Sequence, residues 1–405
     1  ADVGDRIGVE KDEVGQLAFR RDLPHFLHMV VPVADVREGH FHTDVRLDQL
    51  GDLLEADFDL DLTGFTDEEL NNLLNGLADS DGAQEGEDEI PEMGDFFTAQ
   101  LLNEPLLVVR GEEGIVRVMA NVCRHRGMPL AAGRGNTKRF VCSYHAWTYG
   151  HDGALLRAPR MQNAGFDAKG CKLPEHKVQL WNGFIYVTLD PDELDFEHPE
   201  LDALLSPYET GSFRLVHMAE EEWHTNWKCL VENFMEGYHL SVVHPRTLHG
   251  YTPTGLSRKL VSGDGYTSYA ANYPDSSEPR GDGAPGLSEA ERKRSTLFAK
   301  FPTQVTSQAA SLLVSLSIFP IHAGLIRVKW TMSVYQDDLD GDTVQQRIAL
   351  WEEVNREDRE KLERMQVALA SAHAVEGPLA EDDYEGTVRD FQTWLAARDA
   401  RLPDA

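Results

Sequence analysis

Two short segments of this 405-residue chain each place a cysteine close to a histidine. Cys123 and His125 form the first pair, and Cys142 and His145 form the second. Sixteen residues separate His125 from Cys142. Each pair can present one thiolate and one imidazole to a single centre from a short loop. Because both loops must reach the same point, the chain around them has to form a small, closely connected module. The sequence therefore predicts a metal centre in this part of the chain.

Short β-rich runs surround the two pairs. The runs FFTAQLL, PLLVVRG and GIVRVMANV are separated by turn residues, and VQLWNGFIYVTLD closes the series. This rhythm predicts a small all-β domain over residues 94–193. Residues 194–405 read as an α+β domain, with a helical stretch over 225–243, antiparallel strands, and a long helix over 343–372 that has no internal Gly or Pro. Residues 1–47 form an N-terminal segment, and 48–93 an acidic insert or linker without a ligand motif.

Two cysteines and two histidines suit two kinds of metal centre. They are the ligands of a Rieske [2Fe–2S] cluster, and equally of a structural Cys2His2 zinc site. The strings CRHRGMPL and CSYHAWTYG resemble the two cluster loops of the Rieske non-haem iron oxygenases, alpha-subunit type. The cluster ligands implied by this resemblance are Cys123, His125, Cys142 and His145. One departure is Ala146, where the family usually has glycine.

A second pair of histidines lies further along the chain. His239 and His244 are five residues apart, a spacing that means little by itself in a chain with sixteen histidines. The surrounding string ENFMEGYHLSVVHP resembles the mononuclear-iron motif of the same family. The resemblance implies that both histidines bind a non-haem Fe(II). Pro245 is expected to end the helix directly after the second histidine.

A carboxylate is needed to complete such an iron site. Asp358 falls on the apolar face of the long predicted helix, where a buried charge is costly unless it is paired or bound to metal. The residues that define this face are Leu350, Val354, Leu362, Met365 and Leu369. Glu357, Glu360 and Glu363 are predicted to point to solvent. The string from Asn355 to Asp358 also resembles the family's ligand helix, and a buried arginine partner for Asp358 is the alternative.

Glu236 lies one helical turn before the first histidine of the second pair. The resemblance implies that this carboxylate links the iron site to the cluster of a neighbouring subunit, with His145 as the expected partner. It therefore implies a ring-shaped homo-oligomer, expected to be a trimer. The alternative is an ordinary solvated helix residue.

The chain is strongly acidic, with a formal charge of −31. This charge disfavours nucleic acid and anionic lipid as partners. Four cysteines and the lack of a leader or a long apolar run predict a cytoplasmic protein, with Cys171 and Cys229 as free thiols. Between residues 121 and 160, however, seven Lys and Arg oppose only Asp152. This local excess predicts either a docking face for an acidic electron donor or compensation of the cluster's charge.

Together these features predict the oxygenase component of a Rieske oxygenase, which takes electrons from a reductase, with or without a ferredoxin. Glu236 stands where aromatic-ring dioxygenases usually have Asp, which favours hydroxylation or demethylation of a quaternary ammonium compound over cis-dihydroxylation of an arene. Aromatic residues available for a cation cage are Tyr238, Tyr251, Phe301, Phe319, Trp330 and Tyr335. The alternative of another class is a zinc-ribbon interaction protein.

Overall fold

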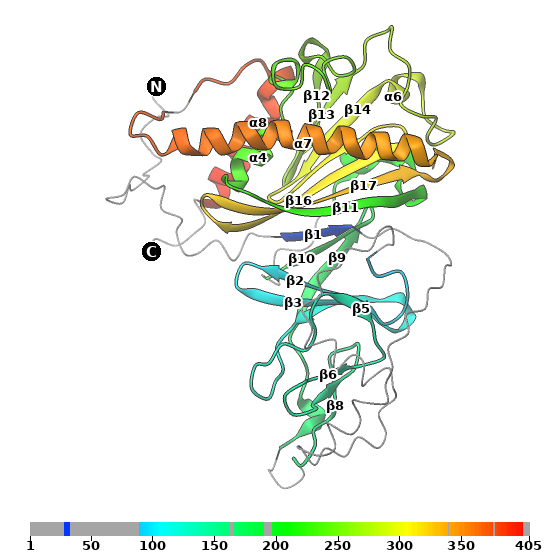
Figure 1. Cartoon of the computed structure of the whole chain (residues 1–405), viewed down its shortest axis with the longest axis vertical. Coiled ribbons are helices and arrows are strands. Elements are labelled where there is room, and N and C mark those ends of the chain that lie inside the picture. The colour runs from blue at the N-terminus through cyan, green and yellow to red at the C-terminus, as the bar shows by residue number, and fades with distance from the viewer. Residues whose placement is uncertain are drawn as a thin grey trace.

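The computed structural model describes residues 28–32, 89–161, 166–189, 197–338, 340–375 and 377–399. Within these ranges the strands form two seven-stranded sheets and one three-stranded sheet. The two large sheets lie one above the other along the long axis of the molecule, and the small sheet lies at the far end (Figure 1). The predicted α+β class, with antiparallel strands and a long C-terminal helix, is confirmed.

The first large sheet forms the framework for the cysteine–histidine loops. Its strands, in spatial order, are β1 (His28–Pro32), β10 (Phe184–Thr188), β9 (Glu175–Trp181), β4 (Val116–Ala120), β3 (Glu104–Arg110), β2 (Asp95–Leu101) and β5 (Arg134–Asn136). The three-stranded sheet consists of β6 (Phe140–Val141), β7 (Thr148–Tyr149) and β8 (Leu155–Arg157). One loop leaves β4 and the other connects β6 to β7, so both emerge beyond the same end of the framework.

The edge strand of the first sheet comes from far upstream in the sequence. Strand β1 pairs antiparallel with β10 in a register that joins His28 to Thr188. The predicted N-terminal segment 1–47 thus contributes a strand to the all-β part. Almost all of the predicted acidic insert, 48–93, lies outside the described residues.

The second large sheet forms the base of the C-terminal α+β domain, later called the catalytic half. Its strands, in spatial order, are β11 (Phe213–Trp223), β17 (Leu325–Tyr335), β16 (Leu312–His322), β15 (Gln304–Gln308), β14 (Arg294–Lys300), β13 (Tyr266–Asn272) and β12 (Ser257–Gly263). The helices are α3 (Pro199–Leu205), α4 (Trp227–Phe234), α5 (Leu240–Val243), α6 (Glu289–Arg292), α7 (Gly341–Leu369) and α8 (Asp382–Asp399). Helices α4, α7 and α8 lie over the face of the sheet that points away from the first sheet (Figure 1). None of the helices in the described ranges has the length and apolar character needed to cross a membrane.

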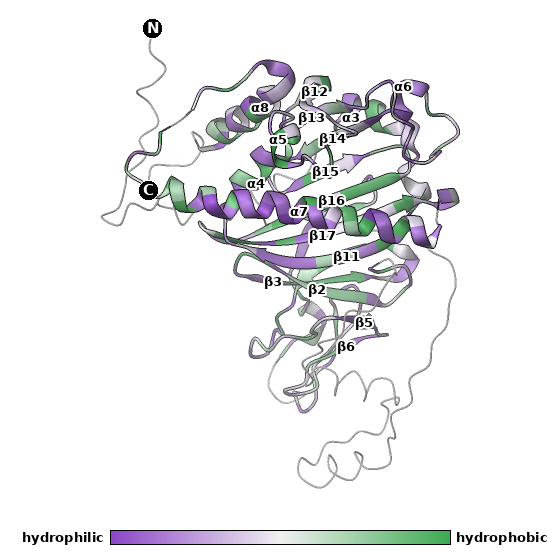
Figure 2. Cartoon of the chain, turned by 45° about the horizontal axis from the view of Figure 1, so that its top comes forward, coloured by the Kyte–Doolittle hydropathy of each residue, from purple (hydrophilic) through white to green (hydrophobic). Residues whose placement is uncertain are grey.

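Helix α7 does not bury the predicted face in its last turns. Val354 and Leu362 are buried in the core that α7 shares with the sheet, as predicted. Met365 and Leu369, in contrast, are 41% and 40% exposed. The reason is that the last turns of α7 run beyond this core, which includes none of the helix residues after Leu362. Figure 2 shows polar and apolar residues mixed along α7, as expected for a helix that buries only one side.

The helix predicted over 225–243 is broken into two. Helix α4 ends at Phe234 and α5 begins only at Leu240. Gly237 lies in the turn between them, where its backbone packs directly against the Ser257 side chain and leaves no space for a Cβ atom. The turn therefore has to form a close contact with β12, and this contact replaces a continuous helix.

A buried ion pair joins the two large sheets. The Glu89 carboxylate, which is fully buried, contacts the ammonium of Lys329 on β17 and, at 2.9 Å, the guanidinium of Arg134 on β5. The Lys329 side chain is only 5% exposed and lies 5.3 Å from the centre of the Phe97 ring on β2. These residues line a crevice of about 350 Å³ between the sheets. None of the predicted metal ligands lines the crevice. We therefore regard it as part of the junction between the two halves.

We expect Lys329→Met to destabilise this junction. The substitution keeps most of the side-chain volume but leaves Glu89 buried with Arg134 as its remaining cation. Loss of one partner of a buried pair costs about 3–5 kcal/mol, and the retained arginine places the expected value near 3 kcal/mol. Thermal unfolding measures the effect, with Lys361→Met on the exposed side of α7 as the control, expected within about 0.5 kcal/mol of wild type. Equal stabilities of the two variants would contradict the proposed role of the pair.

Candidate metal centres

The two cysteine–histidine loops have the same backbone structure. In each loop the amide four residues after the cysteine bonds to the cysteine carbonyl, at 2.9 Å for both Gly127 and Ala146. The cysteine amide in turn bonds to the carbonyl five residues ahead, at 2.9 Å for Cys123 and 2.8 Å for Cys142. Both residues at the fourth position are left-handed, with φ of 75° at Gly127 and 55° at Ala146. The departure noted at Ala146 thus falls where a residue with a Cβ is strained.

The two histidines of these loops lie against each other. The ring centroids of His125 and His145 are 4.5 Å apart, and Trp147 stacks on His125 at 4.8 Å. Both Nδ1 atoms are buried and have no hydrogen-bond partner among the described residues. Burial, followed by the charge of His145, lowers the pKa of His125. Two imidazoles with free nitrogens at one place fit the requirement of a metal centre.

The two cysteines complete this donor set. Cys123 and Cys142 are both free thiols and both 2% exposed. Burial raises the pKa of Cys142, and a hydrogen bond with the Cys123 side chain raises it further. The Tyr149 hydroxyl lies 3.4 Å from Cys123 Sγ and accepts the Arg124 amide at 3.0 Å. A buried thiol pair next to two unpartnered imidazole nitrogens fits a [2Fe–2S] cluster, in which each iron takes one pair.

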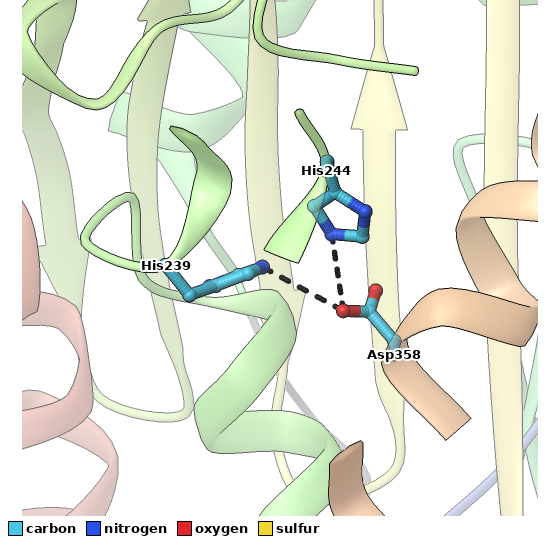
Figure 3. A group of neighbouring side chains, drawn as sticks. All are labelled: His239, His244 and Asp358. Atoms are coloured by element: carbon cyan, nitrogen blue, oxygen red, sulfur yellow. Dashed lines mark ion pairs between the residues drawn. The ribbon is translucent and has the colours of Figure 1, made fainter. Parts of the chain in front are cut away.

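The second candidate centre brings together His239, His244 and Asp358. Potential ligand atoms of the three residues all lie within 4.8 Å of one another. The Asp358 carboxylate Oδ1 lies 3.1 Å from His244 Nε2 and 3.7 Å from His239 Nε2. Figure 3 shows the two imidazoles directed at this carboxylate, while Asp358 approaches from α7. Two imidazoles and one carboxylate facing one point form the ligand set of a mononuclear non-haem iron site.

The electrostatics of these three side chains agree with a shared site. Burial by itself would raise the pKa of Asp358, but His244 and then His239 hold it below its ordinary value. Burial would likewise lower the pKa of His244, but the hydrogen bond and charge of Asp358, followed by those of Glu357, raise it. The predicted burial of Asp358 is confirmed. The alternative of a buried arginine partner is wrong, since its charged neighbours are the two histidines.

Each of the two histidines also has a carboxylate at its other ring nitrogen. Glu236 Oε1 contacts His239 Nδ1, and Glu236 Oε2 accepts the amides of Tyr238 and His239. The Glu236 side chain is only 12% exposed, so a purely solvated role is wrong. Glu357 Oε2 lies 2.8 Å from His244 Nδ1. The prediction that Glu357 points to solvent is therefore wrong, and the helical pattern gave no sign of this contact.

The other two glutamates of α7 that were predicted to point to solvent, Glu360 and Glu363, differ from each other. Glu360 is exposed, as predicted, and it pairs with Arg356. Glu363 accepts the His224 amide at 3.0 Å, and Gln366 accepts the Asn226 amide at 2.8 Å. Because these amides lie directly before α4, the end of α7 anchors the segment that carries the histidines.

The six aromatic residues considered for a cation cage do not come together. Phe301 and Trp330 lie in the main core of the catalytic half, Phe319 in the core of the first sheet, and Tyr335 in a third cluster. Tyr238 and Tyr251 are exposed. The Tyr251 ring is already covered by the Arg280 guanidinium, 3.6 Å from its centre. The prediction that these six residues form a cation cage is therefore wrong.

Comparison with protein families assigns both halves of the chain. The Rieske [2Fe-2S] domain model matches residues 84–178, and the model of the ring hydroxylating alpha subunit (catalytic domain) matches residues 211–400. The two models together cover more than half of the chain. The chain belongs to the Rieske non-haem iron oxygenase family. A ParB-methyltransferase HTH domain model also matches residues 47–99, mostly outside the described residues, and its last residues form part of β2.

The relatives of this Rieske oxygenase chain act on different substrates. It is 37% identical over 164 residues to a glycine betaine monooxygenase oxygenase subunit of Chromohalobacter salexigens, a match over 40% of this chain and 37% of the relative. It is 33% identical over 187 residues to an anthranilate 1,2-dioxygenase large subunit of Acinetobacter baylyi, 44% of this chain and 39% of the relative. These matches thus span less than half of the length of either relative.

A solved structure confirms the fold of the Rieske oxygenase chain. A quaternary ammonium Rieske monooxygenase superposes with a TM-score of 0.66 at 22% identity, over 76% of this chain and 86% of that one. Family membership decides the choice that the four cysteine and histidine ligands left open. The Rieske domain is of the kind that binds a [2Fe–2S] cluster rather than zinc, and the catalytic domain is of the kind that binds mononuclear iron.

We expect Ala146→Gly to stabilise the Rieske domain. Removal of the Cβ relieves about 1–2 kcal/mol of left-handed strain, and the greater freedom of the unfolded chain offsets about 0.4–1 kcal/mol of this gain. Thermal unfolding followed by the visible absorbance of the cluster measures the change. Ala132→Gly in the neighbouring loop, at an exposed position without positive φ, is the control and should lower the midpoint. If Ala146→Gly also lowered the unfolding midpoint, the proposed backbone strain at Ala146 would be contradicted.

We expect Asp358→Ala to remove the mononuclear iron and leave the cluster in place. The total should fall from about three to about two irons per chain, with acid-labile sulfide unchanged at about two. Iron and sulfide analysis measures this, and the visible spectrum of the cluster confirms that the chain is folded. Asp342→Ala, at an exposed position in the first turn of α7, is the matched control. Retention of three irons by Asp358→Ala would show that the ligand assignment is wrong.

Proposed function

We propose that this chain is the oxygenase component of a Rieske oxygenase that oxidises a small organic substrate with dioxygen. The observation that carries the proposal is the buried group of His239, His244 and Asp358 in a chain that also has a Rieske domain. A Rieske electron carrier needs only the first centre, and a zinc-ribbon protein needs neither the second centre nor the catalytic fold.

The residues have separate roles in this proposal. Cys123, His125, Cys142 and His145 would hold the cluster, and His239, His244 and Asp358 would hold a mononuclear iron, a ligand set that leaves coordination positions for oxygen. When bound, the two groups supply electron storage and the activation of dioxygen. Glu236 fixes the ring of His239, since its carboxylate contacts Nδ1 and leaves Nε2 directed at Asp358.

The proposed assembly is a homotrimer, and the positions of the two centres support cooperation between neighbouring chains. The cysteine–histidine loops lie at the far end of the molecule from α4 and α7, which flank the second centre (Figure 1). Two centres at opposite ends of one chain are better connected through a neighbouring copy than through their own. Glu236 is the proposed link, because it combines contact with His239 and a position in the turn between α4 and α5.

The proposed electron donor is a reductase, with or without a ferredoxin, that approaches the Rieske domain. Arg124 and Arg126 are exposed beside the cluster loops, whereas Arg134 is committed to Glu89. The location remains the cytoplasm in this proposal, since a reducing compartment keeps the four free cysteines available.

The proposed substrate is a quaternary ammonium compound, oxidised by hydroxylation or demethylation. Glu at position 236 and the likeness to a glycine betaine monooxygenase subunit support this substrate class. The alternative is cis-dihydroxylation of an arene, which the likeness to an anthranilate dioxygenase subunit supports. A cation of this kind would have to be bound by residues other than the six aromatic residues named from the sequence.

Substrate-dependent oxygen consumption tests this proposal. The iron-loaded protein is supplied with NADH and a surrogate Rieske reductase, and offered glycine betaine, carnitine and choline in parallel with anthranilate and naphthalene. We expect oxygen uptake with a methylammonium substrate, together with formaldehyde if a methyl group is hydroxylated and lost. A cis-diol from an arene would support the alternative, and a protein with one zinc and no sulfide would contradict both.

A further inference from the structure

The imidazole of His244 lies between two consecutive carboxylates of helix α7. Asp358 Oδ1 is 3.1 Å from Nε2 on one side of the ring, and Glu357 Oε2 is 2.8 Å from Nδ1 on the other. The His244 side chain is only 1% exposed. Adjacent residues on a helix are about 100° apart around its axis, so α7 reaches around the ring and meets both of its nitrogens.

Glu357 is itself fixed from a second direction. The Thr247 hydroxyl donates to the same Oε2 atom at 2.6 Å. The Glu357 side chain is 14% exposed, far less than those of Glu353 and Glu360 on the same helix, which are 45% and 60% exposed. A carboxylate that accepts two hydrogen bonds at one buried oxygen has little rotational freedom. Glu357 therefore connects the segment 244–247 to α7.

The two histidines differ in the origin of their second carboxylate. Glu236 belongs to the same turn as His239 and is three residues away from it, and its other oxygen accepts amides of that turn. Glu357 is 113 residues away from His244 in the sequence. The orientation of His239 is thus a local property of one turn, whereas that of His244 depends on the docking of α7.

We propose that Glu357 is a positioning residue that holds His244 with its Nε2 lone pair directed at the iron. A carboxylate at Nδ1 keeps the proton on that nitrogen and fixes the plane of the ring, which strengthens the metal–imidazole bond. The inference rests on the proposed iron site and adds a residue that acts on metal retention through His244. Glu236 acts on the other ring and has a different role in the link between subunits.

Ferrous-iron affinity tests this role without using turnover. Chains that carry the cluster but lack the mononuclear iron are dialysed anaerobically against increasing ferrous iron, and iron above two per chain is counted. We expect Glu357→Ala to bind iron about 10–100-fold more weakly than wild type. Glu357→Gln should lie between them, because its amide oxygen still accepts the Nδ1 proton but lacks the charge. Thr247→Val should weaken binding less than Glu357→Ala does.

Two control variants, Glu360→Gln and His244→Ala, make the result specific. Glu360→Gln, at an exposed position on the same helix, should bind iron within about threefold of wild type, since a larger loss is expected only where a ligand loses its orientation. The cluster absorbance checks folding in every sample, and Glu357→Gln serves if the alanine variant does not fold. Wild-type affinity in folded Glu357→Gln and Glu357→Ala overturns the proposal. If His244→Ala also binds as wild type, the iron site itself is wrongly assigned, so the two failures are distinguishable.

Discussion

The catalytic half depends on one buried carboxylate. Asp358 has to be charged to face His239 and His244, yet it is almost completely removed from solvent. A charge in this position is stable only where opposite charge surrounds it. Glu236 and Glu357 add two more carboxylates at the outer nitrogens of the same imidazoles. Three carboxylates around two imidazoles give an excess of negative charge that a divalent metal ion offsets.

The organisation of the fold follows from the need to assemble this group. Its residues come from α7 and from the turns around α5, which are distant in sequence. Helix α7 holds these turns at several points, because Glu363 and Gln366 accept the amides before α4 and Glu357 contacts His244. The second sheet provides the surface beneath, and its Gly237–Ser257 contact fixes the turn that carries Glu236. The Rieske domain is joined to the opposite face of this sheet through Glu89 and Lys329.

Local patterns predicted which candidate ligands come together better than they predicted the residues around them. The loops around Cys123 and Cys142 are defined by nearby residues, and Asp358 could be recognised as a charge on an apolar helix face. Glu357 could not, because helical periodicity places it beside exposed glutamates while its partner is 113 residues away. The break at Gly237 depends on Ser257, and the separation of the six aromatic residues depends on the sheet. These features arise from tertiary packing, which sequence periodicity does not contain.

Helix α7 is 29 residues long and has no internal proline, so it behaves as a single stiff rod. It carries one proposed ligand, Asp358, and the partner of another, Glu357, on adjacent residues, and it shares a core with the second sheet. Any tilt or rotation of α7 would therefore move both carboxylates together relative to the ring of His244. The geometry at the two nitrogens of this imidazole is thus coupled to the position of a single helix.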